Sequence, residues 1–244
     1  MAIIKKPVAV VIGAGDATGG ACARRFAREG FTVVATRRNA EALQSLLKDI
    51  DSEGGIAHAI GCDAREEEAM VDLFKRIEGD IGRVEVVVFN IGGNVYFPII
   101  ETTAQVYRKV WEMSAFAGFL TGREAARVML PRRRGTIIFT GATASLRGSS
   151  GFSAFASAKF ALRALAQSMA RELGPQGIHI AHSIIDGAID TAFIRQIFPD
   201  KYATKSEGGI IDPEHIAEQY WQIHCQARDC WTHELDLRPW METF

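Results

Sequence analysis

The chain has 244 residues, of which 48% are hydrophobic and 23% are charged, and its formal net charge at pH 7 is -1. A chain of this length buries about three quarters of its unfolded surface, so it needs no disulfide or metal to form a core. The balanced charge excludes a general electrostatic affinity for nucleic acid, and no apolar run is long enough to suggest a membrane span. We expect a globular protein that binds neither.

The cysteines and the N-terminus indicate the compartment. None of the four cysteines belongs to a CxxC pair: Cys22, Cys62, Cys225 and Cys230. This spacing is typical of reduced thiols, and the first apolar run is too short for a signal peptide. Histidines flank the last two cysteines, but in no common zinc spacing. We therefore predict a cytoplasmic protein without a metal.

Short β-branched runs alternate with helical stretches along the chain, which predicts a doubly wound parallel sheet with helices on both faces. Seven strands are expected, at Val8–Ile12, Phe31–Thr36, Ile56–Gly61, Val84–Phe89, Thr136–Thr140, Ile178–Ile184 and Glu234–Leu237. Helices are expected at Gly19–Arg28, Ala40–Ile50, Arg65–Glu78, Ala104–Met129, Ser153–Leu173 and from Pro213 onward. No interior linker interrupts this pattern, so residues 1–244 are predicted to form one α/β domain. The polar segment from Phe193 to Gly209 is the best candidate for a mobile lid.

A glycine-rich turn follows the first predicted strand and opens the first helix. It contains Gly13, Gly15, Ala17, Thr18 and Gly19. Residues without a large side chain let a diphosphate approach the free N–H groups of the helix N-terminus. The turn therefore predicts a dinucleotide site, and a tight strand–helix turn without a ligand is the alternative.

The motifs along the chain resemble those of the short-chain dehydrogenase/reductase family. Its glycine motif is G-x-x-x-G-x-G, in which Gly13 and Gly19 match and Ala17 replaces the middle glycine. The matches continue in order along the chain at Asp63, Asn90, Gly92, Lys159, Gly187 and Thr191. The resemblance implies a Rossmann-like fold, a nicotinamide cofactor, a small-molecule substrate and a homodimer or homotetramer. It also implies that the matched residues contact the cofactor.

Two arginines decide the expected cofactor. Arg37 and Arg38 end the second strand, where an acidic residue would bind the ribose hydroxyl of NAD. A guanidinium pairs instead with the extra phosphate of NADP, so NADP is favoured over NAD. Asp16 in the glycine turn favours NAD instead, because a carboxylate there would repel the extra phosphate. The alternative for the two arginines is that they are simply exposed to solvent at the end of the strand. In the family, the position of Asp63 binds the adenine amine, although this residue also suits a helix N-cap.

The catalytic positions of the family are only partly filled. Lys159 matches the lysine that lowers the pKa of a tyrosine and holds the nicotinamide ribose, but the tyrosine position falls on Phe155. The serine position falls on Ala142, and the asparagine of the proton relay falls on Ser114. The resemblance therefore predicts a cofactor site without the usual general acid.

Other side chains offer a different source of protons. The hydroxyls of Thr140, Thr143, Ser153 and Ser157 lie close in sequence to the vacated positions. Asp186 stands where the family has proline; it suits a turn or an N-cap, and it is also a candidate acid.

Two functions remain open. The first is an NADP(H)-dependent oxidoreductase with a non-standard proton route, which reduces an activated C=C bond or a carbonyl. The second is a dinucleotide-binding sensor or subunit partner without catalysis. The missing acid favours the second function, whereas the retained Lys159, Asn90, Gly187 and Thr191 favour the first.

Overall fold

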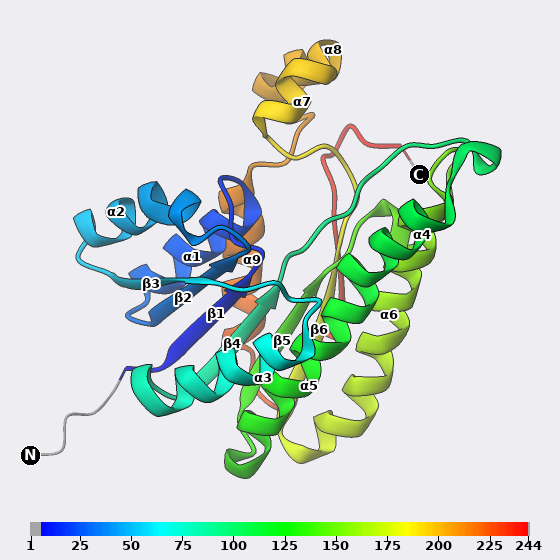
Figure 1. The fold of residues 1–244 in the computed structure, drawn as a ribbon. Helices are drawn as coiled ribbons and strands as arrows, with labels where there is room; N and C mark the ends of the chain where they lie inside the picture. The colour runs from blue at the N-terminus through cyan, green and yellow to red at the C-terminus, as the bar shows by residue number, and fades with distance from the viewer. Residues whose placement is uncertain (1–5, 244) are drawn as a thin grey trace, which may run out of the picture.

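The computed structural model describes residues 6–243, and one parallel sheet forms its centre (Figure 1). The strand order is β3-β2-β1-β4-β5-β6-β7. The strands are β1 (Val8–Ile12), β2 (Thr32–Arg37), β3 (Ile56–Gly61), β4 (Val84–Phe89), β5 (Gly135–Thr140), β6 (Ile178–Ile185) and β7 (Glu234–Leu237). The predicted fold class is confirmed, and each strand end lies within one residue of its expected place.

Helices cover both faces of the sheet (Figure 1). One side carries α3 (Glu67–Arg76), α4 (Ala104–Trp111), α5 (Ala117–Met129) and α6 (Ser153–Leu173). The other side carries α1 (Thr18–Arg28), α2 (Gln44–Ser52) and α9 (Pro213–Cys225). The central strands β1, β5 and β6 are buried along their whole length, and β1 is accordingly a continuous apolar run rather than an alternating one.

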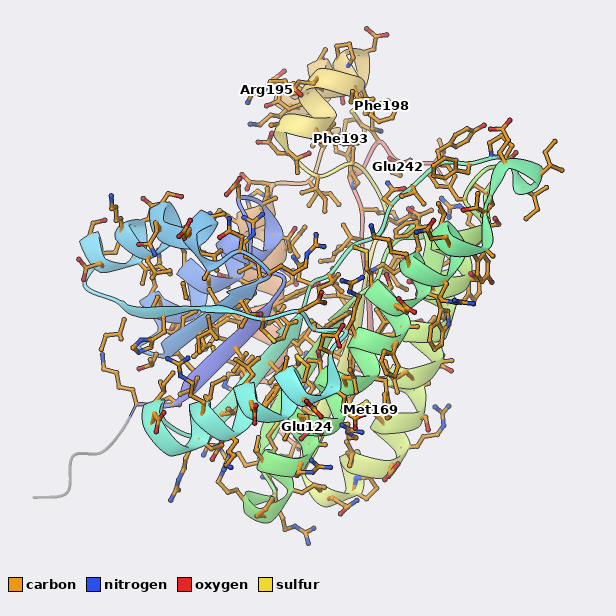
Figure 2. The ribbon with its side chains drawn as sticks, viewed as in Figure 1. Glu124, Met169, Phe193, Arg195, Phe198 and Glu242 are labelled. Atoms are coloured by element: carbon orange, nitrogen blue, oxygen red, sulfur yellow. The ribbon has the colours of Figure 1, made fainter. Side chains whose placement is uncertain are left out.

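Close packing of α5 against α6 fixes the long helix that carries Lys159. A Cβ on Gly122 of α5 would lie 2.8 Å from Sδ of Met169 on α6, and a Cβ on Gly118 would overlap Leu162. Glycine therefore allows the two helices to approach closely; Figure 2 labels Met169 of α6. Within residues 6–243, no helix has both the length and the apolar character needed to cross a membrane.

Some helical segments depart from the sequence prediction in their bounds or geometry. The expected helix Ala104–Met129 is α4 and α5 joined by a π-helical turn at Glu112–Phe116. The helix expected from Arg65 begins at Glu67, because the Asp63 carboxylate accepts a hydrogen bond from the backbone N–H of Arg65 in a separate turn. Such local geometries depend on contacts outside the helix, which the hydrophobic period does not report.

The segment expected to be a lid contains two short helices, α7 (Ala192–Ile197) and α8 (Pro199–Ala203). Thr191 starts α7, because its hydroxyl accepts the backbone N–H of Ile194, and Pro199 starts α8. The helices project beyond the carboxyl ends of the strands (Figures 1 and 2). Their outward apolar side chains are Phe193, Ile197 and Phe198.

Candidate cofactor and active site

Two cavities adjoin at the carboxyl ends of the strands. The larger has a volume of about 650 Å³ and the smaller about 580 Å³. Both are lined by the turn after β1, through Gly13 and Gly15, and by the turn after β4, through Asn90, Ile91 and Gly92. β1 and β4 are neighbours in the sheet, and the strand order reverses there. Parallel α/β sheets bind ligands at such a switch point.

The glycine turn has the shape that a diphosphate requires. Gly13 has a φ of +84°, and a Cβ on Gly19 would lie 2.7 Å from the carbonyl oxygen of Gly13. Gly15 has open space in front of it. Ala17 caps α1 without a side-chain acceptor, and the buried hydroxyl of Thr18 has no hydrogen-bond partner in the described residues. The helix therefore presents donors to the larger cavity, which fits an anionic cofactor group.

The smaller cavity contains the charged residues that sequence analysis assigned to the adenosine end. It is lined by Arg37, Arg38 and Asp63. Among the described residues, neither arginine has a carboxylate within ion-pair distance, whereas Asp63 is paired with Arg65 at 2.5 Å. The hydrogen bonds from Arg65 hold the pKa of Asp63 below its usual value. Asp16 lies in the other cavity, so the arginines and this carboxylate face different regions.

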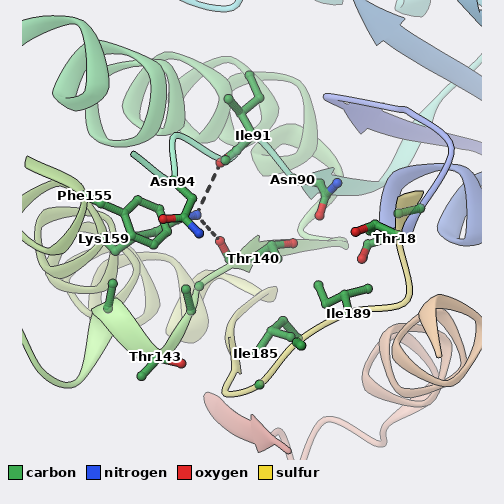
Figure 3. Close-up of a pocket in the computed structure, with 18 of the residues that line it drawn as sticks. Thr18, Asn90, Ile91, Asn94, Thr140, Thr143, Phe155, Lys159, Ile185 and Ile189 are labelled. Carbon is green, nitrogen blue, oxygen red and sulfur yellow. Dashed lines mark hydrogen bonds between the residues drawn. The ribbon is translucent and has the colours of Figure 1, made fainter. Parts of the chain in front are cut away.

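Lys159 lies in the larger cavity (Figure 3). Its side chain is only 3% exposed, and its ammonium donates to the carbonyl oxygens of Thr140 at 2.8 Å and Ile91 at 3.3 Å. Burial lowers the pKa of Lys159 to about 8. The ammonium group of Lys159 is therefore held in position by backbone carbonyls of β5 and of the turn after β4.

The residues that sequence analysis assigned to the family's catalytic positions have different environments. Ala142 and Phe155 both line the larger cavity, and the Phe155 ring centroid lies 5.9 Å from the Lys159 ammonium. Ser114 lies in the π-helical turn, is fully buried and lines neither cavity. Its hydroxyl has no hydrogen-bond partner among the described residues. The structure thus brings two of these three residues to the cavity.

Two turns close the cofactor side of the larger cavity. Asn90 donates its side-chain amide to the Gly13 carbonyl at 3.3 Å, which joins the turns after β4 and β1. Gly92 has open space where a side chain would be.

The turn after β6 forms the opposite wall. Gly187 has a φ of +153°, and a Cβ there would lie 2.5 Å from Pro239. Thr191 also lines the cavity, although its hydroxyl oxygen is used to cap α7. Gly187 is therefore needed for packing of the C-terminal segment as well as for space in the cavity.

Sequence reasoning missed a group of charged residues beside the cavity. The Asp186 carboxylate is 1% exposed and accepts hydrogen bonds from Thr143 at 2.5 Å and Arg147 at 3.3 Å. It also pairs with Arg238 at 3.1 Å. Asp186 is not the N-cap of α7, which is Thr191. The sequence carried no signal for the two arginines, because they come from separate segments that meet only in the fold.

Apolar side chains form the remaining wall of the larger cavity: Phe152, Ile185, Ile189, Phe193 and Ile194. Asn94, an exposed residue, also lines this cavity (Figure 3). Within residues 6–243, no three His, Cys, Asp or Glu side chains are arranged to hold a metal ion. The cavity therefore offers an apolar surface next to a buried cation.

Comparisons with known proteins agree with this geometry. The model of the short chain dehydrogenase family matches residues 7–202. A short-chain dehydrogenase from Rhodopseudomonas palustris is 48% identical, with a TM-score of 0.83 over 96% of this chain and 99% of that chain. A metagenomic short-chain oxidoreductase solved in complex with NADP is 25% identical, with a TM-score of 0.81 over 98% of this chain and 99% of that chain.

A relative with a curated name is also similar. Short chain aldehyde dehydrogenase 1 from Euphorbia lathyris is 27% identical over 218 residues, which are 86% of this chain and 75% of that protein. The family match covers most of the chain and includes β1 to β6, from which both cavities are built. The chain belongs to the short-chain dehydrogenase/reductase family.

Proposed function

We propose that this protein is an NADP(H)-dependent oxidoreductase that uses a proton donor other than tyrosine. The observation that carries the proposal is the buried ammonium of Lys159, held by two backbone carbonyls in a cavity that continues past the glycine turn. A buried cation without a carboxylate partner is costly, which favours a ligand that interacts with it. When bound, the cofactor supplies or accepts a hydride.

The residues of the two cavities fit this cofactor. The turn from Gly13 to Gly19 and the Thr18 hydroxyl suit the diphosphate, and Lys159 suits the nicotinamide ribose. Asn90, Gly92, Gly187 and Thr191 border the space assigned to the nicotinamide, while Asp63 borders the adenine space. We assign these residues to the cofactor on the basis of their positions in the two cavities.

The preference for NADP rests on charge. Arg37 and Arg38 are uncommitted cations in the smaller cavity, and a guanidinium forms paired hydrogen bonds with a phosphate. Asp16 does not line that cavity, so its carboxylate repels a phosphate bound there less than its position in the sequence suggests. A related protein, the metagenomic oxidoreductase, is described in complex with NADP.

The proton route is the unusual part of the proposal. Phe155 and Ala142 occupy the places we assign to the family's tyrosine and serine, and neither has an exchangeable proton. Removal of a general acid typically costs about 10²–10⁴-fold in rate, so a working enzyme needs another donor or a substrate that demands less of one. An activated C=C bond meets the second condition, because its protonation can follow hydride transfer, whereas a carbonyl requires the other donor.

Within residues 6–243, no tyrosine lines the larger cavity, which also supports a second function, a dinucleotide-binding sensor or subunit partner. Fluorescence titration with NADPH and NADH separates cofactor binding from catalysis. Turnover of cyclohexanone, menthone and cyclohexenone is then followed by the absorbance of the reduced nicotinamide. We expect tighter binding of NADPH than of NADH, and oxidation of NADPH by at least one substrate.

Lys159→Ala provides the matched test of the site. It should weaken NADPH binding by about 10–100-fold, the effect of losing charge-assisted hydrogen bonds. NADPH binding without turnover would favour the sensor. If neither nucleotide binds to the parent protein, both functions are wrong.

A further inference from the structure

We propose that Thr143 is a catalytic hydroxyl and that Asp186 receives its proton, so that the pair deprotonates an apolar alcohol as it is oxidised. The inference rests on the proposed function, because oxidised NADP must accept the hydride. It assigns a direction and a substrate class to the larger cavity.

The register of the sheet brings the two residues together. Thr140 of β5 pairs with Ser183 of β6, and Thr143 and Asp186 each lie three residues further along the chain. Thr143 begins a 3-10 turn, Thr143–Ser145, and lines the larger cavity (Figure 3). Its hydroxyl donates to Oδ1 of Asp186 at 2.5 Å, a charge-assisted bond of the strong class.

The surroundings of Asp186 fix the orientation of its carboxylate. Arg147 donates to both carboxylate oxygens, at 3.3 and 3.4 Å, and Arg238 approaches Oδ2 at 3.1 Å. Arg238 is shared with Asp236 at 2.5 Å. With two guanidiniums beside it and almost no exposure to solvent, the carboxylate is held in one position, with Oδ1 directed at the Thr143 hydroxyl.

The other hydroxyls of the cavity are engaged differently. The Thr140 hydroxyl lies 2.9 Å from the buried hydroxyl of Tyr220, and the Thr191 hydroxyl caps α7. The Thr18 hydroxyl has no partner in the described residues. Of the hydroxyls that line this cavity within residues 6–243, Thr143 alone is hydrogen bonded to a carboxylate. This bond lets Thr143 accept a proton from a substrate while it passes its own proton on.

The reaction balances in the oxidative direction. The O–H bond of the alcohol breaks, its proton forms a bond to Oγ1 of Thr143, and the original proton of Thr143 moves to Oδ1 of Asp186. The hydrogen on the alcohol carbon would leave with the electron pair of its C–H bond, as the hydride that oxidised NADP would accept, and the carbon–oxygen single bond would become a carbonyl. The alcohol is oxidised by two electrons, and the cofactor is reduced by two. An apolar alcohol suits the wall formed by Phe152, Ile185 and Ile189.

Substitution of the hydroxyl tests the pair. Thr143→Val is nearly isosteric, Thr143→Ser keeps the hydroxyl, and Ser150→Ala removes an exposed hydroxyl that does not line the cavity. With menthol, borneol and cyclohexanol as probes and oxidised NADP as acceptor, Thr143→Val should lower kcat by about 10²–10⁴-fold. Thr143→Ser should retain kcat within about tenfold, and Ser150→Ala within about threefold. KM, NADPH affinity and Tm should be unchanged in all three variants.

Asp186→Asn is a second variant, which keeps the size of the side chain. It should lower kcat without lowering NADPH affinity. Because two protons move, the parent should turn over more slowly in deuterium oxide, with a curved dependence on deuterium content.

Several results would overturn the inference. A Thr143→Val variant that keeps the parental kcat excludes the hydroxyl from catalysis, and one that loses NADPH binding or Tm assigns it a structural role. Reduction of cyclohexenone by a parent protein that leaves every alcohol unchanged refutes this inference alone. A parent that binds NADPH but turns over no substrate refutes the proposed function together with it.

Discussion

The two cavities that meet at the glycine turn are built in different ways. The smaller cavity is lined mainly by residues that directly follow β1, β2 and β3, within short stretches of chain. The larger one combines the glycine turn with residues from α6, α7 and the ends of β4, β5 and β6. The cofactor region is therefore a local motif repeated at neighbouring strands, whereas the region assigned to the chemistry is an assembly of distant segments.

This difference shows where the family pattern can change. Backbone turns must remain as they are to accept the cofactor, and Gly13 and Gly19 leave no space for a side chain. We expect side chains in the larger cavity to tolerate exchange while the fold persists, because we assign Phe155 and Ala142 to the family's tyrosine and serine positions. Four predictions test this contrast.

The largest expected effect comes from restoring the family's usual groups in the larger cavity. The double substitution Ala142→Ser with Phe155→Tyr places a phenol near the Lys159 ammonium and should raise kcat for ketone reduction by about 10²-fold or more. Steady-state kinetics with menthone measure it. Phe152→Tyr, in the same cavity, is the control. An equal gain in the control, or none in the double variant, would contradict the assignment of these positions.

Burial of Lys159 should make stability depend on pH. Its pKa is lowered from 10.5 to about 8 in the folded protein, so the unfolded chain binds the extra proton between these values. The free energy of unfolding should therefore rise with pH across this window, by about 3 kcal/mol from this group. Measuring the free energy of unfolding of the parent and of Lys159→Met at several pH values isolates the contribution of Lys159.

Lys48→Met removes an exposed lysine and serves as the control. It should follow the parental pH curve, whereas Lys159→Met should lack this part of the rise. Parallel curves for all three proteins would show that Lys159 titrates normally.

In the smaller cavity, Arg37→Asp should shift the preference from NADPH toward NADH. Loss of a charge-assisted bond to the phosphate changes the ratio of the two dissociation constants by about 10–100-fold. Fluorescence titration measures both constants. Arg83→Asp, an equal charge change at an exposed residue before β4, should leave the ratio unchanged. An unaltered preference in Arg37→Asp would argue that the arginine is only a solvated strand end.

The smallest effects are expected at the projecting helices. Phe193 is 57% exposed and lines the larger cavity, whereas Phe198 is 50% exposed and does not line it. Substitution of either by serine should change the free energy of unfolding by less than about 0.5 kcal/mol. Only Phe193→Ser should raise KM for menthone, by about threefold to tenfold, through loss of apolar contact. Equal KM values for the two variants would remove Phe193 from the substrate wall.

Several features were predictable because they depend on short stretches of chain. The apolar runs indicated all seven strands, and the glycine spacing indicated the turn that borders both cavities. Lys159 was found from its place in the motif, but its burial and its two carbonyl partners were not.

The sequence by itself determined the order of strands and helices, the glycine turn and the identity of the residues at the family positions. Only the tertiary structure decided that Ser114 is enclosed in a π-helical turn, that the segment after Thr191 is helical, and that Asp186 meets Thr143. The physical reason is the separation along the chain over which each interaction acts. Hydrophobic period and turn chemistry act over a few residues, whereas hydrogen bonds such as the one between Thr143 and Asp186 join residues 43 positions apart and form only when parallel strands align.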